Sequence, residues 1–253
     1  MLLITTLEKT ESTNAYLQNL IQKKKKADEK SIYIDVPEFY TVCCNFQTNG
    51  RGQKENVWHS DPEKNILLST VIYPNIDADK QFYVNMSITL GIIDFCKKTI
   101  AQKGFSIKWP NDIYYQDKKM GGILIEHTIV SNKILYSVVG IGININQIHF
   151  PESIPNPISA SQICGTSFHV DQCIRNMLSA IIERYTNDMK NLDKLKKEYM
   201  NSLYRFNAQS EFIHNETPVL ATIKDVNPYG MLCLTTIEGK DIECGFKEIS
   251  YVI

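Results

Sequence analysis

Apolar side chains recur along the chain with two spacings, and each spacing predicts one kind of secondary structure. Where apolar residues fall three or four positions apart they form a stripe on a helix, a pattern that is longest from residue 79 to about 103. The run at 66–73 is apolar at nearly every position, so we expect a strand buried on both faces. Helices are expected at about 12–26, 79–103, 171–190 and 192–204, and strands at 39–46, 66–73, 106–109, 122–130 and 134–145.

The segments between and after these elements complete the expected architecture. Residues 48–61 are polar and contain two glycines, so they predict a loop. From about residue 206, short apolar stretches alternate with turn pairs such as Asn227-Pro228, which predicts a small β-barrel of about five strands. We therefore expect an α+β protein, with a mixed β-sheet flanked by helices over residues 1–205 and a small all-β domain over residues 206–253.

The composition of the chain limits its possible partners. Hydrophobic residues make up 43% and charged residues 22%, as in ordinary globular proteins. The net charge is -1, with 27 basic and 28 acidic side chains, which is unlike proteins that bind nucleic acid through broad phosphate contacts. We therefore expect no nucleic-acid partner, and we interpret the basic run at 23–26 as the solvated end of the first helix.

The cysteines and the hydropathy of the chain predict its compartment. The chain has 7 cysteines, an odd number, without a Cys-x-x-Cys pair, and its 5 histidines lack the spacing of metal ligands. The first residues lack a signal-peptide pattern, and no apolar run approaches the roughly 20 residues that a membrane helix needs. We therefore expect a reduced, cytoplasmic protein without a membrane partner.

Three segments carry residues typical of a reaction site, although each has a simpler interpretation. The loop at 47–58 places Arg51 between Gly50 and Gly52, where backbone N–H groups can approach an anion; an ordinary surface turn is the alternative. The turn at 108–112 ends in an aspartate that could bind Mg²⁺ or a ribose hydroxyl, and a plain Pro-Asn-Asp turn is the alternative.

The third segment combines the run at 118–122 with a strand that contains Gly140 and Gly142. Because these glycines are two residues apart in a strand, they face the same side, where the missing side chains leave room for a flat ligand. Close packing between elements is the alternative. A dinucleotide-binding fingerprint does not fit, because its third glycine and its following helix are both missing.

Together these segments resemble the biotin–protein ligase family, which includes biotin–[acetyl-CoA-carboxylase] ligases and holocarboxylase synthetases. The resemblance covers roughly residues 1–205, and the C-terminal stretch resembles the SH3-like barrel of the family. The residues that carry it are Glu11-Ser12-Thr13-Asn14, Gly50-Arg51-Gly52 with Trp58, Lys108-Trp109-Pro110-Asn111-Asp112, Lys119-Met120-Gly121-Gly122 and Gly140-Ile141-Gly142-Ile143-Asn144. Because the motifs begin at residue 11, we expect a form without the N-terminal DNA-binding domain that some members carry.

This resemblance implies a class II synthetase-like catalytic fold and an ATP-dependent, AMP-forming ligase. Biotin and ATP, with Mg²⁺, would give biotinyl-5'-AMP and pyrophosphate. The biotinyl group would then pass to a lysine of a biotin carboxyl carrier protein, in acetyl-CoA carboxylase or another biotin-dependent carboxylase. The resemblance is compatible with a monomer or a homodimer.

The resemblance also implies a role for each matched residue. Lys119, Arg51 and Asp112 would be catalytic, and Asp112 would lie near Mg²⁺ bound through the phosphates. The biotin-binding residues would be Ser12, Thr13, Asn14, Gln47, Gly50, Arg51, Gly52, Lys119, Gly121 and Gly122. The ATP-binding residues would be Arg51, Gln53, Trp58, Asn111, Asp112, Lys119, Gly142 and Asn144.

Two positions depart from the family pattern. Many members carry a second arginine directly after Gly-Arg-Gly and further basic residues before the tryptophan, whereas this chain has Gln53 and Asn56 there. We expect Lys54 to replace part of the missing charge. The rival interpretations are a lipoate–protein ligase or octanoyl transferase, and a non-catalytic sensor of biotin or a nucleotide.

Overall fold

The computed structural model describes residues 2–27, 32–53 and 56–253. They form two compact units, each built from two stretches of the chain: residues 1–76 with 118–179, and residues 77–117 with 180–253. The domain boundary expected at residue 205 stays a prediction. Among the described residues, no helix combines the length and the apolar character needed to cross a membrane.

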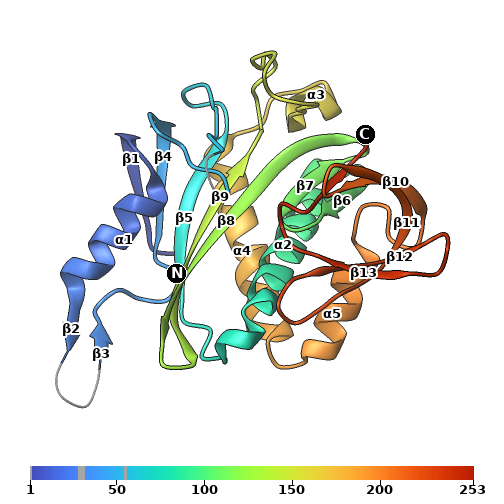
Figure 1. The fold of residues 1–253 in the computed structure, drawn as a ribbon. Coiled ribbons are helices and arrows are strands. Elements are labelled where there is room, and N and C mark those ends of the chain that lie inside the picture. Colours follow the sequence, from blue (N-terminus) through green and yellow to red (C-terminus); the bar gives the residue numbers. More distant parts are fainter. Residues whose placement is uncertain (1, 28–31, 54–55) are drawn as a thin grey trace. The chain divides into compact units, whose positions relative to one another are not determined.

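The first unit contains strands of a mixed β-sheet (Figure 1). Across the sheet these strands follow the order β1 (Ile4–Thr10), β4 (Thr41–Gln47), β5 (Ile66–Ile72), β9 (Lys133–Ile143) and β8 (Lys118–Val130). β1 runs parallel to β4, and the other neighbours are antiparallel. All seven residues of β5 are buried, which confirms the prediction for the apolar run at 66–73.

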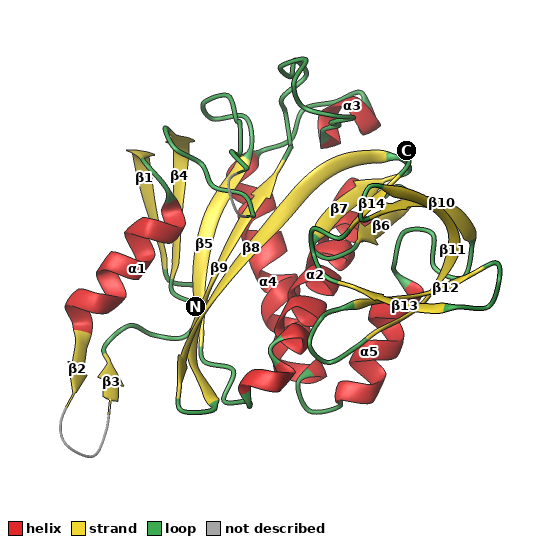
Figure 2. Cartoon of the chain, viewed as in Figure 1, coloured by secondary structure: helices red, strands yellow, loops and turns green. Residues whose placement is uncertain are grey.

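Helix α1 (Thr13–Lys24) packs on one face of this sheet (Figure 2). The buried core that it shares with the strands contains Leu17, Ile21, Val42, Val71 and Val138. Leu17 and Ile21 are four residues apart, so both point to the same side of the helix, and the predicted helical pattern is confirmed. The first residues of α1 therefore lie close to β5 and β9.

The basic run after α1 differs from the prediction. α1 ends at Lys24, because the backbone is extended at Lys25 with φ -77 and ψ 128. Lys25 and Lys26 then belong to β2 (Lys25–Ala27), which pairs with β3 (Ile32–Ile34) rather than closing the helix. The later helices α3 (Ala160–Cys164) and α4 (Val170–Asp188) follow the strands of the sheet.

The second unit combines helices with two β structures. Its helical elements are η1 (Ala78–Lys80), α2 (Phe82–Phe95), η2 (Cys96–Ile100), the end of α4 from Ala180 and α5 (Leu192–Asn201). Its hairpin pairs β6 (Phe105–Lys108) with β7 (Asp112–Tyr115). The described residues after 206 form an antiparallel sheet in the order β13 (Asp241–Cys244), β12 (Leu232–Thr236), β11 (Thr217–Val226), β10 (Gln209–His214) and β14 (Ile249–Tyr251). This sheet confirms the prediction of a small strand-rich C-terminal region.

Three elements correct the sequence-based expectation. The helix predicted at 79–103 is interrupted: α2 ends at Phe95, and a π-helical turn follows until Ala101 adopts a left-handed backbone with φ 57. Strands β1 and β7 were not predicted. β1 is a partly exposed edge strand that includes Glu8 and Lys9, and β7 has only four residues, so neither shows a continuous apolar pattern.

Candidate active site

The start of α1 is tied to the end of β4 by hydrogen bonds to one side chain. The backbone N–H of Thr13 donates to Gln47 Oε1 over 2.8 Å, and the Thr13 hydroxyl donates to the same oxygen over 3.2 Å. Ser12 and Thr13 are each only 3% exposed. The Gln47 Nε2 group lies 3.2 Å from the position that a Cβ would take at Gly50. The structure thus brings together four of the residues predicted to bind biotin.

Asn14, the next residue of α1, places its whole amide group inside the protein. Its Oδ1 accepts a hydrogen bond from Ser69 Oγ over 2.5 Å, and its Nδ2 donates to Glu126 Oε2 over 2.7 Å. Thr13 Oγ1 lies 2.7 Å from Ser69 Oγ, whose single hydrogen is already donated to Asn14. A Cβ at Gly140 would come within 2.3 Å of Asn14 Oδ1. Gly140 therefore makes room for Asn14, which corrects the prediction that its open face accommodates a ligand.

The loop after β4 folds back on itself through its backbone. Trp58 N–H donates to Gly50 O over 2.9 Å, and Gly52 N–H donates to a carbonyl across the loop over 2.7 Å. A Cβ at Gly50 would come within 2.5 Å of the Trp58 carbonyl oxygen, so the close approach requires glycine. Arg51 is exposed and Gln53 is half-buried. The predicted compensating residue at position 54 lies outside the described residues.

The Trp58 ring occupies the space beside β9 that Gly142 leaves open. A Cβ at Gly142 would come within 2.5 Å of the indole Cε2. Lys119 Nζ lies 5.9 Å from the centroid of the Trp58 ring. Trp58 Nε1 is buried and has no hydrogen-bond partner among the described residues. Three residues predicted to bind ATP thus meet here, around an indole N–H for which a ligand can supply the acceptor.

The other predicted residues of this region lie on β8 and just after β9. Gly122 pairs directly with Gly142. Gly121 pairs with Ile143, and a Cβ there would come within 2.3 Å of Ile143 Cδ1, so this glycine allows close packing between the strands. Asn144 is 4% exposed, and its Nδ2 donates to a backbone carbonyl of the following loop over 3.2 Å. Its amide is therefore held in one orientation.

Asn111 and Asp112 lie in the second unit, whereas the other predicted site residues lie in the first. They follow Pro110 in the turn between β6 and β7. The Pro110 carbonyl accepts hydrogen bonds from Asn85 Nδ2 of α2 over 2.8 Å and from the Tyr199 hydroxyl of α5 over 3.2 Å. Two buried donors from two helices thus fix the backbone directly before these residues.

Trp109 joins the same turn to the C-terminal sheet. Its Nε1 donates to Gly230 O over 3.0 Å, and its ring lies 5.2 Å from the ring of Phe246. Gly230 has a positive φ of 87°, and a Cβ there would come within 2.5 Å of the Phe82 ring. The turn that carries Asn111 and Asp112 is therefore packed against the C-terminal sheet within the second unit.

A metal site built by the protein alone is not found in the part of the chain that the structure describes. No group of three or more His, Cys, Asp or Glu side chains there could hold a metal ion. However, Mg²⁺ that binds with a nucleotide takes most of its ligands from phosphates and water, and only one or two from carboxylates. Asp112, half-buried at the start of β7, suits a role as such a single carboxylate.

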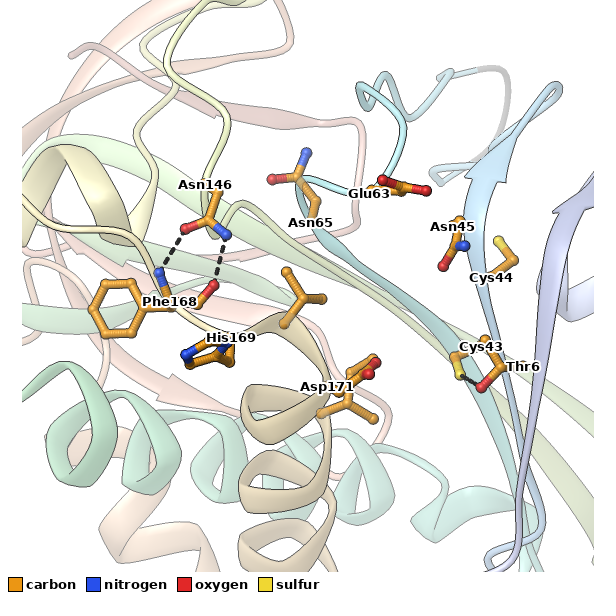
Figure 3. Close-up of a pocket in the computed structure, with 12 residues that line it drawn as sticks. Thr6, Cys43, Cys44, Asn45, Glu63, Asn65, Asn146, Phe168, His169 and Asp171 are labelled. Carbon is orange, nitrogen blue, oxygen red and sulfur yellow. Dashed lines mark hydrogen bonds between the residues drawn. The ribbon is translucent and has the colours of Figure 1, made fainter.

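A separate polar cavity of about 390 Å³ lies in the first unit between β4 and the start of α4 (Figure 3). Its lining includes Thr6, Cys43, Asn146 and His169, but none of the predicted site residues. Cys43 Sγ lies 3.2 Å from Thr6 Oγ1, and burial raises the pKa of the Cys43 thiol. The thiol is therefore poorly suited to act as a nucleophile.

Comparison with known proteins identifies the family. The model of the Biotin/lipoate A/B protein ligase family matches residues 9–144. The chain belongs to this family. Every predicted site residue, from Ser12 to Asn144, lies within the matched range.

Several members of the family are similar to the chain over part of their length. It is 30% identical over 186 residues to the "Bifunctional ligase/repressor BirA" of Bacillus spizizenii, covering 72% of this chain and 57% of that protein. It is 30% identical over 155 residues to the protein of the same name from Escherichia coli, covering 60% and 44%. It is 34% identical over 119 residues to "Biotin–protein ligase 2" of Arabidopsis thaliana, covering 45% and 35%. The chain thus spans between 35% and 57% of the length of these relatives.

Solved structures of family members share the fold. "Biotin protein ligase from Aquifex aeolicus in complex with biotin and ATP" has a TM-score of 0.76 at 22% identity, covering 99% of this chain and 98% of that chain. The "Biotin Acetyl Coenzyme A Carboxylase Synthetase from Helicobacter pylori with bound Biotinylated ATP" has a TM-score of 0.59 at 19% identity, covering 96% and 100%. The likeness confirms the α+β fold, and the C-terminal antiparallel sheet is consistent with an SH3-like domain.

Two polar residues of the site were missed by the sequence analysis although they lie inside the family match. Ser69 is a fully buried serine in the middle of the apolar strand β5, and Glu126 lies on β8. A hydroxyl in a strand that is buried on both faces needs a hydrogen-bond partner, which is the signal that the sequence offered for Ser69. Nothing in the sequence pattern distinguishes Glu126 from an ordinary surface glutamate.

Proposed function

We propose that the protein is a biotin–protein ligase, which activates biotin with ATP and transfers it to a lysine of a carrier protein. The observation that carries the proposal is the hydrogen-bonded pair of buried Thr13 and half-buried Gln47 beside the Gly50 loop. Buried donors and acceptors match a cyclic urea, which has both an oxygen acceptor and N–H donors. The names of the relatives and the ligands of the Aquifex aeolicus structure support the same substrates.

In the first step, a carboxylate oxygen of biotin forms a bond to the α-phosphorus of ATP, and the bond to pyrophosphate breaks. Two anions must meet, so the reaction needs cations that offset their repulsion and the charge that develops. Lys119 is half-buried in the first unit with its ammonium near Trp58, and Arg51 is exposed on the glycine loop. We propose that Lys119 is the cation held in place in the site. We propose that Arg51 is a second cation, which reaches the reacting groups when the glycine loop closes over them.

In the second step, the amine of the carrier lysine attacks the acyl carbon of biotinyl-5'-AMP, the bond to AMP breaks, and the amine loses a proton. A mixed anhydride is prone to hydrolysis, so the site must cover it until the carrier arrives. The backbone of Gly50 and Gly52 can approach an anion closely, because neither residue has a side chain. We propose that this loop covers the adenylate and that Trp58 packs against its adenine.

The nucleotide needs further groups. We propose that Asn144 contacts the adenine, that Asn111 and Asp112 serve the triphosphate, and that Mg²⁺ enters bound to the phosphates. Mg²⁺ supplies charge neutralisation there, and Asp112 offers one carboxylate. The partner would be a biotin carboxyl carrier domain of a carboxylase such as acetyl-CoA carboxylase, and the protein would act as a monomer or a homodimer.

We propose the cytoplasm as the place of action. All seven cysteines lie within the described residues and are free thiols. Reduced cysteines are typical of cytosolic proteins, whereas secreted proteins tend to form disulfides.

The main alternative is a lipoate–protein ligase, because the description of the family covers both activities. A lipoyl ring has neither the carbonyl oxygen nor the N–H groups of a urea, so it would leave buried polar groups of this site without partners. Such a mismatch reduces the specificity constant by about 10⁴–10⁵-fold in sites built to hydrogen-bond a substrate. The polar pair of buried Thr13 and half-buried Gln47 therefore favours biotin.

The experiment that tests this proposal measures pyrophosphate release from Mg-ATP by the whole protein. Release should depend on biotin, should be far slower with lipoate or octanoate, and should be absent without an acid substrate. Release with lipoate at the rate seen with biotin would contradict the proposal. Binding of biotin without any release of pyrophosphate would instead support the non-catalytic sensor.

A further inference from the structure

We propose that Asn65 and Gln147 are positioning residues that attach the end of the loop between β4 and β5 to the segment after β9, and so hold Trp58 in place for a nucleotide. Neither Asn65 nor Gln147 belongs to a motif that the sequence analysis singled out. The inference rests on the proposed function, because that proposal assigns Trp58 to the adenine.

The loop between β4 and β5 is attached at its start by backbone groups. Thr48 N–H donates to Thr10 O over 3.0 Å, and Asn49 N–H donates to Glu11 O over 2.9 Å. Every residue except proline can supply such an N–H group. The attachment at the start of the loop therefore does not depend on particular side chains.

The end of the same loop is attached by two buried side-chain amides. Asp61 N–H donates to Gln147 Oε1 over 2.9 Å, and Asn65 Nδ2 donates to Ser60 Oγ over 2.9 Å. Asn65 Nδ2 also donates to Gln147 Oε1 over 2.6 Å, and Ser60 Oγ gives its own hydrogen to Asp61 O over 3.1 Å. Asn65 is 3% exposed and Gln147 2%, so solvent has little access to either amide.

The donors and acceptors of the two amides fix their orientations. Asn65 Oδ1 accepts from Ile145 N–H over 2.9 Å, and the two hydrogens of Asn65 Nδ2 go to Ser60 and Gln147. Gln147 Oε1 accepts two hydrogen bonds, and Gln147 Nε2 donates to His149 O over 2.9 Å. The backbone groups of Ile145 and His149 cannot exchange donor and acceptor roles. Neither amide can therefore rotate by 180° without losing hydrogen bonds.

The segment to which these amides attach the loop also carries the groups assigned to the nucleotide. Gly142, near the end of β9, leaves the space that the Trp58 ring occupies, and Asn144 is assigned to the adenine. Asn65 holds the backbone N–H directly after Asn144, and Gln147 follows in the same segment. The two amides thus join the residues that follow Trp58 to the end of the strand on which its ring lies.

Trp58 is consequently held from both directions along the chain. On one side its own N–H donates to Gly50 O over 2.9 Å, and on the other side the residues that follow it are held by the two amides. If the amide contacts are lost, the attachment through Gly50 remains, but the ring can move away from Gly142 more easily. We therefore expect weaker nucleotide binding rather than its loss. Biotin affinity should not change, because Thr13 and Gln47 lie at the other end of the site.

The first test compares two neighbouring amides, each replaced by an apolar side chain of similar size. Gln147→Met removes the oxygen that holds Asp61, whereas Asn146→Leu removes an amide whose hydrogen bonds go to the backbone of Phe168 (Figure 3). Calorimetry with the whole protein should give a Kd for Mg-ATP about tenfold higher in Gln147→Met, with the biotin Kd within about twofold of the wild type. Asn146→Leu should change neither Kd by more than about twofold.

The second test reads the position of Trp58 in the ligand-free protein. The chain has 2 tryptophans, and the other one, Trp109, is only 4% exposed, so quenching of fluorescence by iodide reports mainly on Trp58. Gln147→Met should raise the quenching constant about twofold, because the ring opens to solvent more often. Asn146→Leu should leave the quenching constant unchanged.

A third variant does not depend on how Gln147→Met folds. Ser60→Ala keeps both amides and removes only a half-buried hydroxyl that accepts from Asn65. It should raise the Kd for Mg-ATP about fourfold and increase quenching in the same direction, with the biotin Kd unchanged.

The inference requires both changes together. An unchanged Kd for Mg-ATP in Gln147→Met and Ser60→Ala overturns it, and so does a raised Kd with unchanged quenching, because the effect would then not pass through Trp58. An equal weakening of biotin binding also overturns it, since general damage to the structure would affect both ligands.

These measurements separate the inference from the proposed function. If the wild type binds Mg-ATP and biotin but releases no pyrophosphate, the proposed ligase activity fails, while the Kd for Mg-ATP and the quenching of Trp58 still decide the inference. If the wild type binds no Mg-ATP at all, both fail.

Discussion

The two ends of the candidate site in the first unit are built in different ways. At one end, buried side chains of α1 and β5 and a half-buried glutamate of β8 join each other through the hydrogen bonds of Asn14 and Ser69. At the other end, the loop at 50–58 folds back through hydrogen bonds between backbone groups, and its Arg51 is exposed. The first end is fixed by side chains, and the second leaves its charged side chain in solvent.

This difference indicates a division of work. A fixed, buried set of donors and acceptors can discriminate between ligands, because a mismatch leaves groups unsatisfied that solvent hardly reaches. A loop held mainly by its own backbone can change its arrangement at low cost when a ligand arrives. We therefore expect substitutions at the buried end to change biotin affinity, and substitutions in the loop to change retention of the adenylate.

The largest effect is expected at Lys119, whose ammonium lies near the Trp58 ring at the loop end. Lys119→Ala should reduce biotin-dependent pyrophosphate release by about a thousandfold or more, because its ammonium serves the anionic reaction centre. Lys118 is the matched control: it is exposed, and neighbouring side chains of a strand point to opposite faces. Lys118→Ala should stay near the wild-type rate, and circular dichroism should show both variants folded. If Lys119→Ala were active and Lys118→Ala inactive, the catalytic lysine would have been assigned to the wrong residue of the motif.

The next test concerns the second unit, which carries Asn111 and Asp112. The comparison of the two ends in the first unit does not include the turn that holds these residues. Gly230→Ala would place a Cβ within 2.5 Å of the Phe82 ring, beside the carbonyl that accepts from Trp109. Turnover should fall by about tenfold or more, with a higher KM for ATP and little change in biotin affinity.

The matched control for Gly230→Ala is Gly239→Ala. Gly239 has a similar positive φ of 80°, but a Cβ there would meet nothing within 4 Å. Both variants pay the backbone strain of an alanine at positive φ, on the order of 1 kcal/mol, so thermal melts should show similar small losses. Equal turnover in the two variants would mean that the contact with Phe82 has no role in the reaction.

The two glycines of β9 separate the ends of the site directly. Gly140→Ala would displace Asn14 at the buried end, whereas Gly142→Ala would displace the Trp58 ring at the loop end. The first should raise the biotin Kd by about tenfold, and the second should mainly raise the KM for ATP by a similar factor. Steady-state kinetics and calorimetry on both variants check this. If both variants changed the biotin Kd and the KM for ATP in the same way, the two ends of the site would not have separate roles.

The smallest effect is expected at Gln53, where many family members carry an arginine. Gln53→Arg should slow the release of biotinyl-adenylate from a pre-loaded enzyme by several-fold, because a charge-assisted contact on a loop partly open to solvent contributes up to about 1 kcal/mol. Lys54→Ala should speed release if that lysine supplies part of the missing charge; residue 54 lies outside the described residues. Identical release rates in all three proteins would mean that this part of the loop does not retain the adenylate.

The sequence predicted those parts of the site that depend on local order along the chain. The motif around Thr13, the glycine loop and Lys119 could be found because their residue types and spacing are recognisable without the fold. Ser69 and Glu126 could not, because their contacts to Asn14 depend on which strands lie beneath the start of α1. Gly140 was read as open space for a ligand for the same reason: its missing side chain is matched by a residue of another element.

The fold shows the same limit. The apolar run of β5 and the helical stripe of α1 were predicted because burial leaves a periodic pattern. β7 was missed because it begins at Asp112, which the sequence assigned to the Pro-Asn-Asp turn, and β1 because an edge strand with charged residues lacks an apolar run. Lys25 and Lys26 were assigned to a helix because nothing local shows that they pair with β3.

The transfer of biotin to a carrier protein is the central claim, and one measurement tests it most directly. The whole protein is incubated with biotin, Mg-ATP and a biotin carboxyl carrier domain, and the carrier is then weighed by mass spectrometry. The proposed function predicts that the carrier gains the mass of one biotinyl group at its lysine, and that Lys119→Ala under the same conditions leaves it unchanged. An unmodified carrier with the wild-type protein, or equal modification with Lys119→Ala, would contradict it.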